Sequence, residues 1–401
     1  MKQSPVDIST PAVGRLPKSA RALGIGLLAA ALVTGYAIWF LHTEDELTVG
    51  FLLVFAVVAT VIAARTGTFR HVERAFSQHE KVMNGAAICG VLVIAGVFHE
   101  AHFTLLMIST VLLYMLAGLG LTIQFGYLGL VNLSGASFLG VGAYTAAVMI
   151  EHTSVPPLLI LLAGGLMAAL AGGLLILPVL RTKGHYAAVV TIAFAILFKS
   201  FLEVNDTLGG AQGLSTGEMS LFGWGFNSSI EFANGLFISF YFQYLLLSLA
   251  LLVVAFALTK RLERSWIGLS MDAVRLDETA AACYGLNIGR WKALGFTLGN
   301  FLIGIAGALY AMMLGFIAPA NFGFSDSLIL VSIVLLGGMG NPWGLAVASA
   351  IVVILPEKLQ MIQEYRFLLF ASLVILILLF RPGGLLPRGM RNYIPGWSGK
   401  S

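Results

Sequence analysis

Few residues of this 401-residue chain have the types and spacing that chemistry requires. His99, Glu100 and His102 lie together, but a helical zinc site needs two histidines four residues apart, and these are three apart. We expect them to be ordinary residues of a short loop at the membrane surface. Residues 398–401 read Ser-Gly-Lys-Ser like the end of a phosphate-binding loop, but Ile394 stands where that motif needs its first glycine. The sequence therefore predicts neither a metal site nor an ATP site.

Polar residues inside the apolar runs are few and uncharged, and they form no Ser-His-Asp set and no carboxylate pair. They are Gln124, Asn132, Ser134, Ser137 and Asn300, while Lys199 lies near the end of a run, from which its side chain can reach the surface. A charge at the membrane centre costs about 2.5 to 3.5 kcal/mol, so ion-coupling carboxylates at depth would mark a proton- or sodium-driven carrier. We therefore expect no catalytic residues and no cofactor, and an energy source outside this chain.

The charge that the chain does carry is concentrated around residues 265–292. Ser270 is a candidate cap for a helix that begins at Met271, with Asp272 in its first turn, and Gly285 is a natural stop. A short helix of this kind, with a small-residue face and a charged face, fits the groove of a partner protein; the alternative is a solvated loop that only joins two spans. The charged residues of the window and its approach are Lys260, Arg261, Glu263, Arg264, Asp272, Arg275, Asp277, Glu278, Arg290 and Lys292.

The elements around these residues are helices that cross a membrane. Hydrophobic residues make up 58% of the chain and charged residues only 10%, which is typical of lipid-embedded helices. A helix needs about 20 apolar residues to cross the hydrocarbon layer, and the continuous runs exclude the alternating pattern of a barrel. The predicted fold is an all-α, polytopic transmembrane helix bundle with about ten spans. We place the spans near 22–41, 47–64, 83–98, 103–123, 133–150, 157–180, 184–202, 236–258, 293–314 and 367–381.

Two further features concern how the helices pack. The apolar stretch 327–356 contains glycines and a proline, and we expect two short helices around a break, or a re-entrant pair. Small residues at a spacing of four, Gly164, Ala168 and Gly172, predict close helix packing. The residues of the expected break include Gly337, Gly338, Gly340, Asn341 and Gly344.

The distribution of Lys and Arg predicts the orientation, because these residues accumulate in cytoplasmic loops. Basic residues lie before the first span, after the second and sixth, and after the last, whereas residues 203–235 contain four acidic and no basic residues. Both termini should be cytoplasmic and the 203–235 loop extracellular, so the net charge of +4 calls for no nucleic-acid partner. We divide the chain into a cytoplasmic tail (1–21), an N-terminal membrane extension (22–102), a core (103–381) and a second cytoplasmic tail (382–401).

Several segments, in order along residues 103–390, resemble the branched-chain amino acid (LivM-type) family of ABC importer permeases. RLDETAAACYGLN at 275–287, followed by an apolar run, is similar to the coupling loop of such permeases. The other matching segments are GYLGLVNLSGASFLGVGAYTAA (126–147), LRTKGHYAAVVTIAF (180–194), GGAQGL (209–214), GALYAMMLGFIAPANFGF (307–324), VLLGGMGNPWG (334–344) and FRPGGLLP (380–387).

The resemblance implies a multi-pass permease subunit of a bacterial inner membrane, in contact with membrane lipid. It implies a second homologous permease, two ABC ATPase subunits and a periplasmic solute-binding protein as partners. The ATPase-coupling residues would be Ser270, Asp272, Arg275, Asp277, Glu278, Ala281, Gly285 and Asn287. The translocation pathway would include Gln124, Asn132, Ser134, Ser137, Gly140, Tyr144 and Asn300.

The chain departs from the family pattern in two places. Leu276 stands where the family commonly has an acidic residue, and Asn132, Leu133, Ser134 and Gly135 stand where it often has His or a Gly- and Ser-rich turn. Leucine, isoleucine and valine are the first expectation for the substrate, with urea, short amides or other amino acids as alternatives. A secondary carrier that works alone, and holds substrate at the broken helix, remains a second hypothesis.

Overall fold

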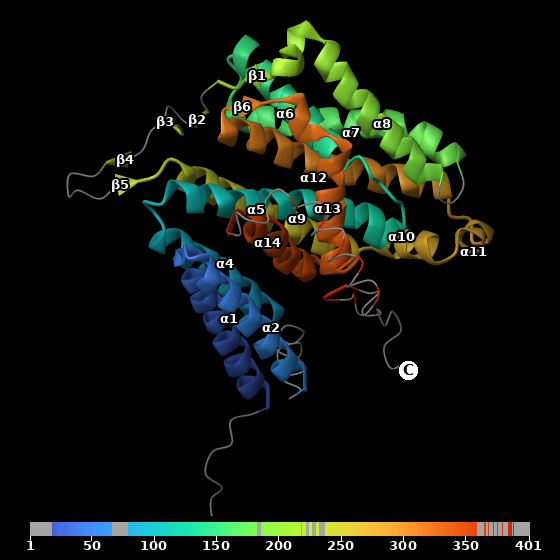
Figure 1. Cartoon of the computed structure of the whole chain (residues 1–401). Coiled ribbons are helices and arrows are strands. Elements are labelled where there is room, and N and C mark those ends of the chain that lie inside the picture. Colours follow the sequence, from blue (N-terminus) through green and yellow to red (C-terminus); the bar gives the residue numbers. More distant parts are fainter. Residues whose placement is uncertain are drawn as a thin grey trace, which may run out of the picture. The chain divides into compact units, whose positions relative to one another are not determined.

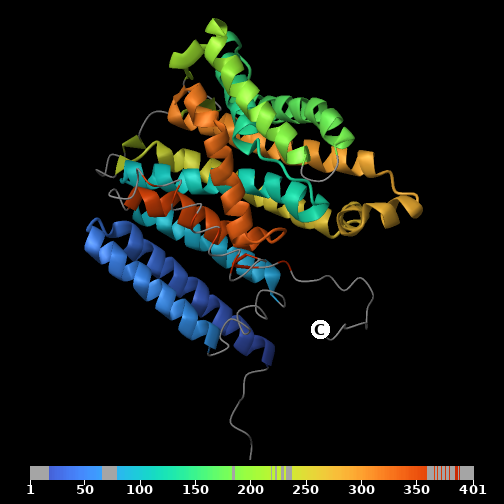
Figure 2. The same ribbon diagram turned by 45° about the vertical axis from the view of Figure 1, so that its right-hand side comes forward.

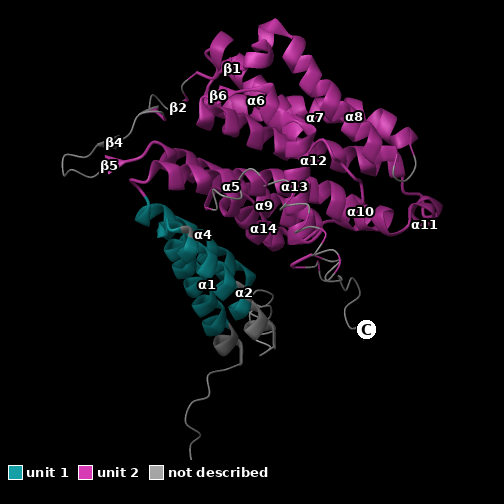
Figure 3. Cartoon of the chain, viewed as in Figure 1, with its two compact units in different colours: residues 1–98 teal, residues 99–401 magenta. Residues whose placement is uncertain are grey.

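A computed structural model of the chain describes residues 18–65, 79–182, 186–217, 219–221, 224–226, 230–231 and 237–358, with positions 365, 368, 372, 375, 379, 384–386 and 388. The structure is a polytopic bundle of helices, as predicted (Figure 1). It divides into two compact units, residues 1–98 and 99–401 (Figure 3). Most of the predicted span 367–381 and nearly all of the C-terminal tail lie outside the described residues. The four-part division made from the sequence stays a prediction.

The first unit contains α1 (Lys18–His42), α2 (Glu46–Arg65) and α4 (Glu80–Val97). Gly90 of α4 lies against Thr34 of α1, and the Tyr36 hydroxyl of α1 donates to the Leu52 carbonyl of α2 at 3.1 Å. In the turn between α1 and α2, hydrogen bonds from the side chain and backbone of Thr48 hold the pKa of Asp45 below its ordinary value.

The second unit is built around α12 (Ile288–Leu314), which packs against three other long helices (Figures 1 and 2). These neighbours are α5 (His102–Thr122), α6 (Gly135–His152) and α7 (Pro157–Arg181). The other helices of the unit are α8 (Tyr186–Val204), α9 (Tyr241–Glu263), α10 (Trp266–Leu276), α11 (Glu278–Cys283), α13 (Phe324–Gly337) and α14 (Pro342–Lys358).

Small residues bring these helices together at α12. A Cβ atom built on Gly164 of α7 would meet the side chain of Ala308, and one built on Gly142 of α6 would meet the backbone of Gly304. Close backbone approach of this kind is how helices associate in lipid, where apolar burial alone gives no driving force. The packing role predicted for the small residues of α7 is confirmed, and α12 is the helix that they approach.

The loop between α8 and α9 folds back onto the end of α12. Strand β1 (Leu214–Ser215) pairs antiparallel with β6 (Phe316–Ile317), with Leu214 opposite Ile317, and the Thr216 hydroxyl donates to the Ala311 carbonyl at 2.9 Å. Two further antiparallel pairs are β2 (Ser220–Leu221) with β3 (Trp224–Gly225) and β4 (Ile230–Glu231) with β5 (Phe237–Ile238). Single turns of 3-10 helix are η2 (Asp206–Leu208), η3 (Gly210–Gln212) and η4 (Pro319–Phe322).

Seven helices of the described residues are long and apolar enough to cross a membrane. Each coincides with a predicted span to within a few residues. The predicted spans at 47–64 and 133–150 fall on α2 and α6, which are not among the seven. Helices α13 and α14 have 14 and 17 residues, shorter than the roughly 20 of a full span, so the predicted break within 327–356 is confirmed. The seven are Leu23–His42, Glu80–Val97, His102–Tyr127, Pro157–Arg181, Tyr186–Val204, Tyr241–Glu263 and Ile288–Leu314.

Candidate functional site

Three amide side chains form a fully buried polar cluster in the middle of the second unit. Gln124 Nε2 donates to Asn300 Oδ1 at 2.9 Å and to the Phe296 carbonyl at 3.1 Å. Asn132 Nδ2 donates to Gln124 Oε1 at 2.7 Å, and Asn132 Oδ1 accepts from the backbone and hydroxyl of Ser134 at 3.0 and 2.6 Å. Four of the predicted pathway residues therefore meet in one hydrogen-bonded network that has no access to solvent in this conformation.

The backbone explains why this cluster forms. Helix α5 continues at its end as the π-helical turn η1 (Ile123–Tyr127), which carries Gln124. Single π-helical turns inside α-helices are rare and are frequent at functional sites. Just before η1, Gly120 of α5 meets Gly299 of α12, and the two glycines allow the helix backbones to touch. This contact brings Asn300 within reach of Gln124.

The other three predicted pathway residues follow one face of α6. Gly140 lies against Phe198 and Phe322, and the Tyr144 ring meets the Phe322 ring edge-on at 5.9 Å. Ser137 Oγ and Tyr144 Oη are buried and have no hydrogen-bond partner among the described residues. Gly140 and Tyr144 lie beside aromatic rings, and Ser137 and Tyr144 lie outside the hydrogen-bond network of the amides. The pathway role of all seven residues stays a prediction.

The charged window folds as two short helices rather than one, and its predicted cap is wrong. Ser265 caps α10 by accepting from Gly268 N, whereas Ser270 lies inside α10 and donates to the Trp266 carbonyl at 3.0 Å. Asp277 interrupts the helix and caps α11, accepting from the backbone of Thr279 and Ala280 at 2.8 and 3.0 Å. Asp272 is accordingly not in a first turn, since α10 begins at Trp266.

The predicted stop at Gly285 agrees with the structure. Gly285 follows α11 with φ of +80°, a left-handed conformation that suits glycine. Asn287 caps α12 by accepting from Arg290 N at 3.1 Å, and Lys292 Nζ lies 2.6 Å from Glu278 Oε1. Ala281 is the buried residue of α11. Helices α10 and α11 are thus fixed to the start of α12.

The exposed side of α10 and α11 combines charge with bare apolar groups. Leu276 is 78% exposed and Tyr284 is 88% exposed. The charged residues Arg275, Asp277 and Glu278 are exposed as well. We call these five residues the docking surface, after the role predicted from the sequence for this window. The uncharged Leu276 is an apolar point on that surface.

Asp272 does not belong to the docking surface, because it is only 6% exposed and faces inward. Arg388, near the C-terminus, donates from Nη1 and Nη2 to the two carboxylate oxygens of Asp272 at 2.7 and 2.9 Å. Arg388 Nε also lies 3.4 Å from Glu263 Oε1. No motif in the sequence linked these three residues, which are up to 125 positions apart.

The break between α13 and α14 is a glycine turn closed by a tight backbone contact. Gly338 and Gly340 have φ of +107° and +93°, and Gly337 and Gly344 face each other so closely that neither has room for a Cβ atom. Asn341 accepts from Trp343 N at 3.1 Å, which starts α14. All five residues predicted for the break therefore take part in it.

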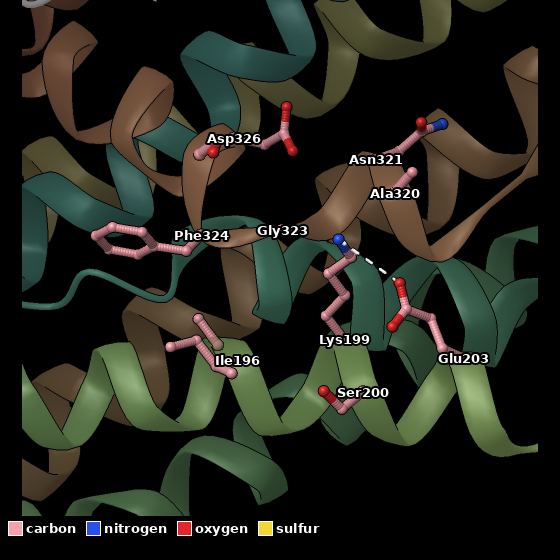
Figure 4. A pocket seen from close by; sticks show the side chains of 11 residues that line it. Ile196, Lys199, Ser200, Glu203, Ala320, Asn321, Gly323, Phe324 and Asp326 are labelled. Carbon is pink, nitrogen blue, oxygen red and sulfur yellow. Dashed lines mark ion pairs between the residues drawn. The ribbon is translucent and has the colours of Figure 1, made fainter. Parts of the chain in front are cut away.

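A polar pocket of about 630 Å³ lies between α8 and the first turn of α13 (Figure 4). Lys199 Nζ lies 3.6 Å from Glu203 Oε1 on the α8 side, and Asn321 and Asp326 line the opposite side. Ile196 and Phe324 supply apolar walls. None of the residues predicted for the pathway lines this pocket. The acidic end of α8, at the edge of the base-free loop, was the available sequence signal for it.

The model of the family "Branched-chain amino acid transport system / permease component" matches residues 103–380 of the chain. The chain belongs to this family. The match covers the polar cluster, the docking surface and the broken helix. The protein is therefore a multi-pass membrane protein and a transport permease of this family.

Individual relatives agree with the family. The chain is 34% identical over 311 residues to the high-affinity branched-chain amino acid transport system permease protein LivM of Escherichia coli strain K12. The aligned region covers 74% of this chain and 73% of that protein. It is 26% identical over 326 residues to the probable branched-chain amino acid transport permease protein LivM of Methanocaldococcus jannaschii, covering 69% of this chain and 90% of that protein.

A second type of relative carries a different name. The chain is 26% identical over 290 residues to the high-affinity branched-chain amino acid transport system permease protein LivH of E. coli K12, covering 69% of this chain and 91% of that protein. No solved structure matches this permease.

Proposed function

We propose that this permease is the membrane subunit of an ATP-driven importer for leucine, isoleucine and valine. In this proposal it forms the pathway with a second, related permease, receives substrate from a periplasmic binding protein and is driven by two separate ATPase subunits. The observation that carries the proposal is the docking surface. It combines exposed charge with exposed Leu276 and Tyr284, and it is joined through Asn287 to the helix around which the unit is built.

The placement of the docking surface supports a mechanical role. Helices α10 and α11 connect α9 to α12 with only one to four residues between successive helices. The ion pair of Lys292 with Glu278 fixes α11 to α12 as well. A push on α10 and α11 therefore acts directly on α12, whose Asn300 belongs to the buried polar cluster. An ATPase that closes on ATP is the partner that would deliver such a push from the predicted cytoplasmic side.

The pocket beside α8 supports an amino acid as the solute. An amino acid carries a carboxylate and an ammonium group, and the pocket presents one cation, Lys199, and two carboxylates, those of Glu203 and Asp326. Ile196 and Phe324 offer apolar surface to an aliphatic side chain. The predicted orientation places this end of α8 outside, where solute would arrive. The names of the relatives support branched-chain amino acids within this class.

Reconstitution tests the proposal. The permease, its partner permease, both ATPases and the binding protein are placed in vesicles, and uptake of labelled leucine is compared with ATP and with a non-hydrolysable analogue. We expect uptake only with hydrolysable ATP. Uptake that proceeds equally without ATP would instead support a carrier that works alone.

A competition assay in the same vesicles tests the solute. Excess unlabelled isoleucine or valine should suppress leucine uptake, whereas urea and acetamide should not. Suppression by urea or acetamide alone would contradict the proposed substrate.

A further inference from the structure

Residues 384–386 bind the break between α13 and α14. Leu385 N donates to the Leu336 carbonyl at 2.8 Å, and Leu386 N donates to the Gly337 carbonyl at 3.2 Å. These are carbonyls of the last turn of α13, which have no partner within the helix. Gly384, with φ of +81°, lies against Gly338 so closely that a Cβ atom would not fit. The segment therefore caps α13 and closes the break.

Arg388 then fixes this segment to α9 and α10. Its guanidinium makes two parallel hydrogen bonds to Asp272 of α10, a geometry specific to arginine. It also pairs with Glu263, the last residue of α9. Burial lowers the pKa of Arg388, but Asp272 and Glu263 outweigh that effect and leave the pKa raised. One largely buried cation is thus held between a carboxylate at the end of α9 and a carboxylate in the second turn of α10.

The other side of Arg388 faces the turn that carries Gln124. The guanidinium carbon lies 4.6 Å from the centre of the Tyr127 ring, and Nη1 lies 3.5 Å from the Gly126 carbonyl. Gly126 in turn lies against the backbone of Gly340 in the break. Gln124, Gly126 and Tyr127 all belong to the five-residue turn η1, so a displacement at Tyr127 acts within one turn on the buried amide cluster.

We propose that Arg388 is the positioning residue through which movement of α10 reaches η1 and the cluster of Gln124, Asn132 and Asn300. Residues 384–386, which precede Arg388 in the chain, link the same movement to the α13–α14 break. This inference rests on the proposed function, because it takes the docking surface as the place where the ATPase acts. Asp272 is buried against Arg388, and Arg275 of the docking surface lies 3.9 Å from Asp272 Oδ1. Asp272, which lies outside the docking surface, is therefore the residue that passes its movement on.

The experiment separates coupling from folding and from docking. Arg388→Lys keeps the charge and loses the paired guanidinium geometry, and Arg388→Gln loses both. Arg181→Gln, an exposed arginine at the end of α7, is the matched control. Each variant is purified with its partner permease, ATPases and binding protein, and the number of ATP molecules hydrolysed per leucine transported is measured in vesicles.

We expect both Arg388 variants to retain the ATPases and to raise this ratio by about tenfold, the order of effect seen for residues that couple distant sites. The Arg181 control should keep the wild-type ratio.

Two results would overturn the inference. One is an unchanged ratio in assembled Arg388→Lys and Arg388→Gln complexes; the other is loss of folded complex in both, which would assign Arg388 to stability alone. Failure of the wild-type chain to retain an ATPase would instead refute the proposed function, so the two failures are distinguishable.

Discussion

At the residue scale, the buried amide side chains of this permease hydrogen-bond to one another. Gln124, Asn132 and Asn300 each have a partner in the cluster, and a buried polar group left unpaired costs free energy. The sequence identified these residues because polar side chains are rare in its apolar runs. It could not predict that they meet, since that depends on η1 and on the contact of Gly120 with Gly299. It also missed Arg388, whose partners come from distant parts of the chain.

Replacing Asn300 tests the cluster. Asn300→Leu removes the acceptor for Gln124 Nε2, and we expect a loss of about 1 to 3 kcal/mol in the free energy of unfolding. Thermal unfolding of the purified protein in detergent measures the effect. Thr297→Val, one turn away, removes only a hydroxyl that bonds within its own helix and serves as the control. Equal melting temperatures for both variants would show that the cluster contributes nothing to stability.

Replacing Lys199 tests the pocket beside α8. Lys199→Met keeps the length of the side chain and removes the cation that faces Glu203. We expect the KM for leucine uptake to rise about threefold, because a half-exposed charge contributes under about 1 kcal/mol. The kcat of uptake and the assembly of the complex should not change. An unchanged KM would exclude Lys199 from solute binding.

At the element scale, the permease's docking surface lies on two capped helices, α10 and α11, which are joined at Asp277. The sequence predicted its place, its charge and its end at Gly285, because these follow from local composition. The start of α10 was wrong, since Ser265 and Ser270 are both serines that could cap and only the path of the chain from α9 decides between them. The division into two helices depends on Asp277, which was interpreted as a surface charge.

Two substitutions at Asp277 separate its cap from its charge. Asp277→Asn keeps an oxygen that can accept from Thr279 and Ala280, while Asp277→Ala loses the cap and should cost about 1 kcal/mol of stability. We expect both to weaken retention of the ATPase in co-purification, and only Asp277→Ala to lower the melting temperature. If Asp277→Asn retains the ATPase fully, the charge of Asp277 is not part of docking.

At the scale of the whole molecule, fold class and the order of the helices followed from hydropathy, because lipid forces continuous apolar helices. The break within 327–356 was also predictable, from its glycines and Pro342. The central position of α12 was not, since many helices of this chain carry small residues and the sequence does not say which pair. Orientation in the membrane remains a prediction from the distribution of Lys and Arg.

A natural cysteine tests that orientation. Cys283 is a free, exposed thiol at the end of α11, and Cys89 can be replaced by serine to leave it as the single cysteine. A maleimide that cannot cross membranes should label Cys283 in inside-out vesicles. It should not label Cys283 in cells whose outer membrane is permeabilised and whose inner membrane is intact. Labelling in those cells would show the opposite topology, with the docking surface on the wrong side for an ATPase.

The measurement that tests the central claim most directly is a crosslink from the docking surface. A photoreactive phenylalanine analogue replaces Tyr284, the more exposed of the two apolar side chains of that surface, and the assembled transporter is irradiated in the membrane. Tyr186, an exposed tyrosine at the start of α8, receives the same analogue as the control. We expect a crosslink between position 284 and an ATPase subunit, and none from position 186. A crosslink from position 284 to the binding protein, or to no protein while the complex is intact, would contradict the proposed docking of the ATPase.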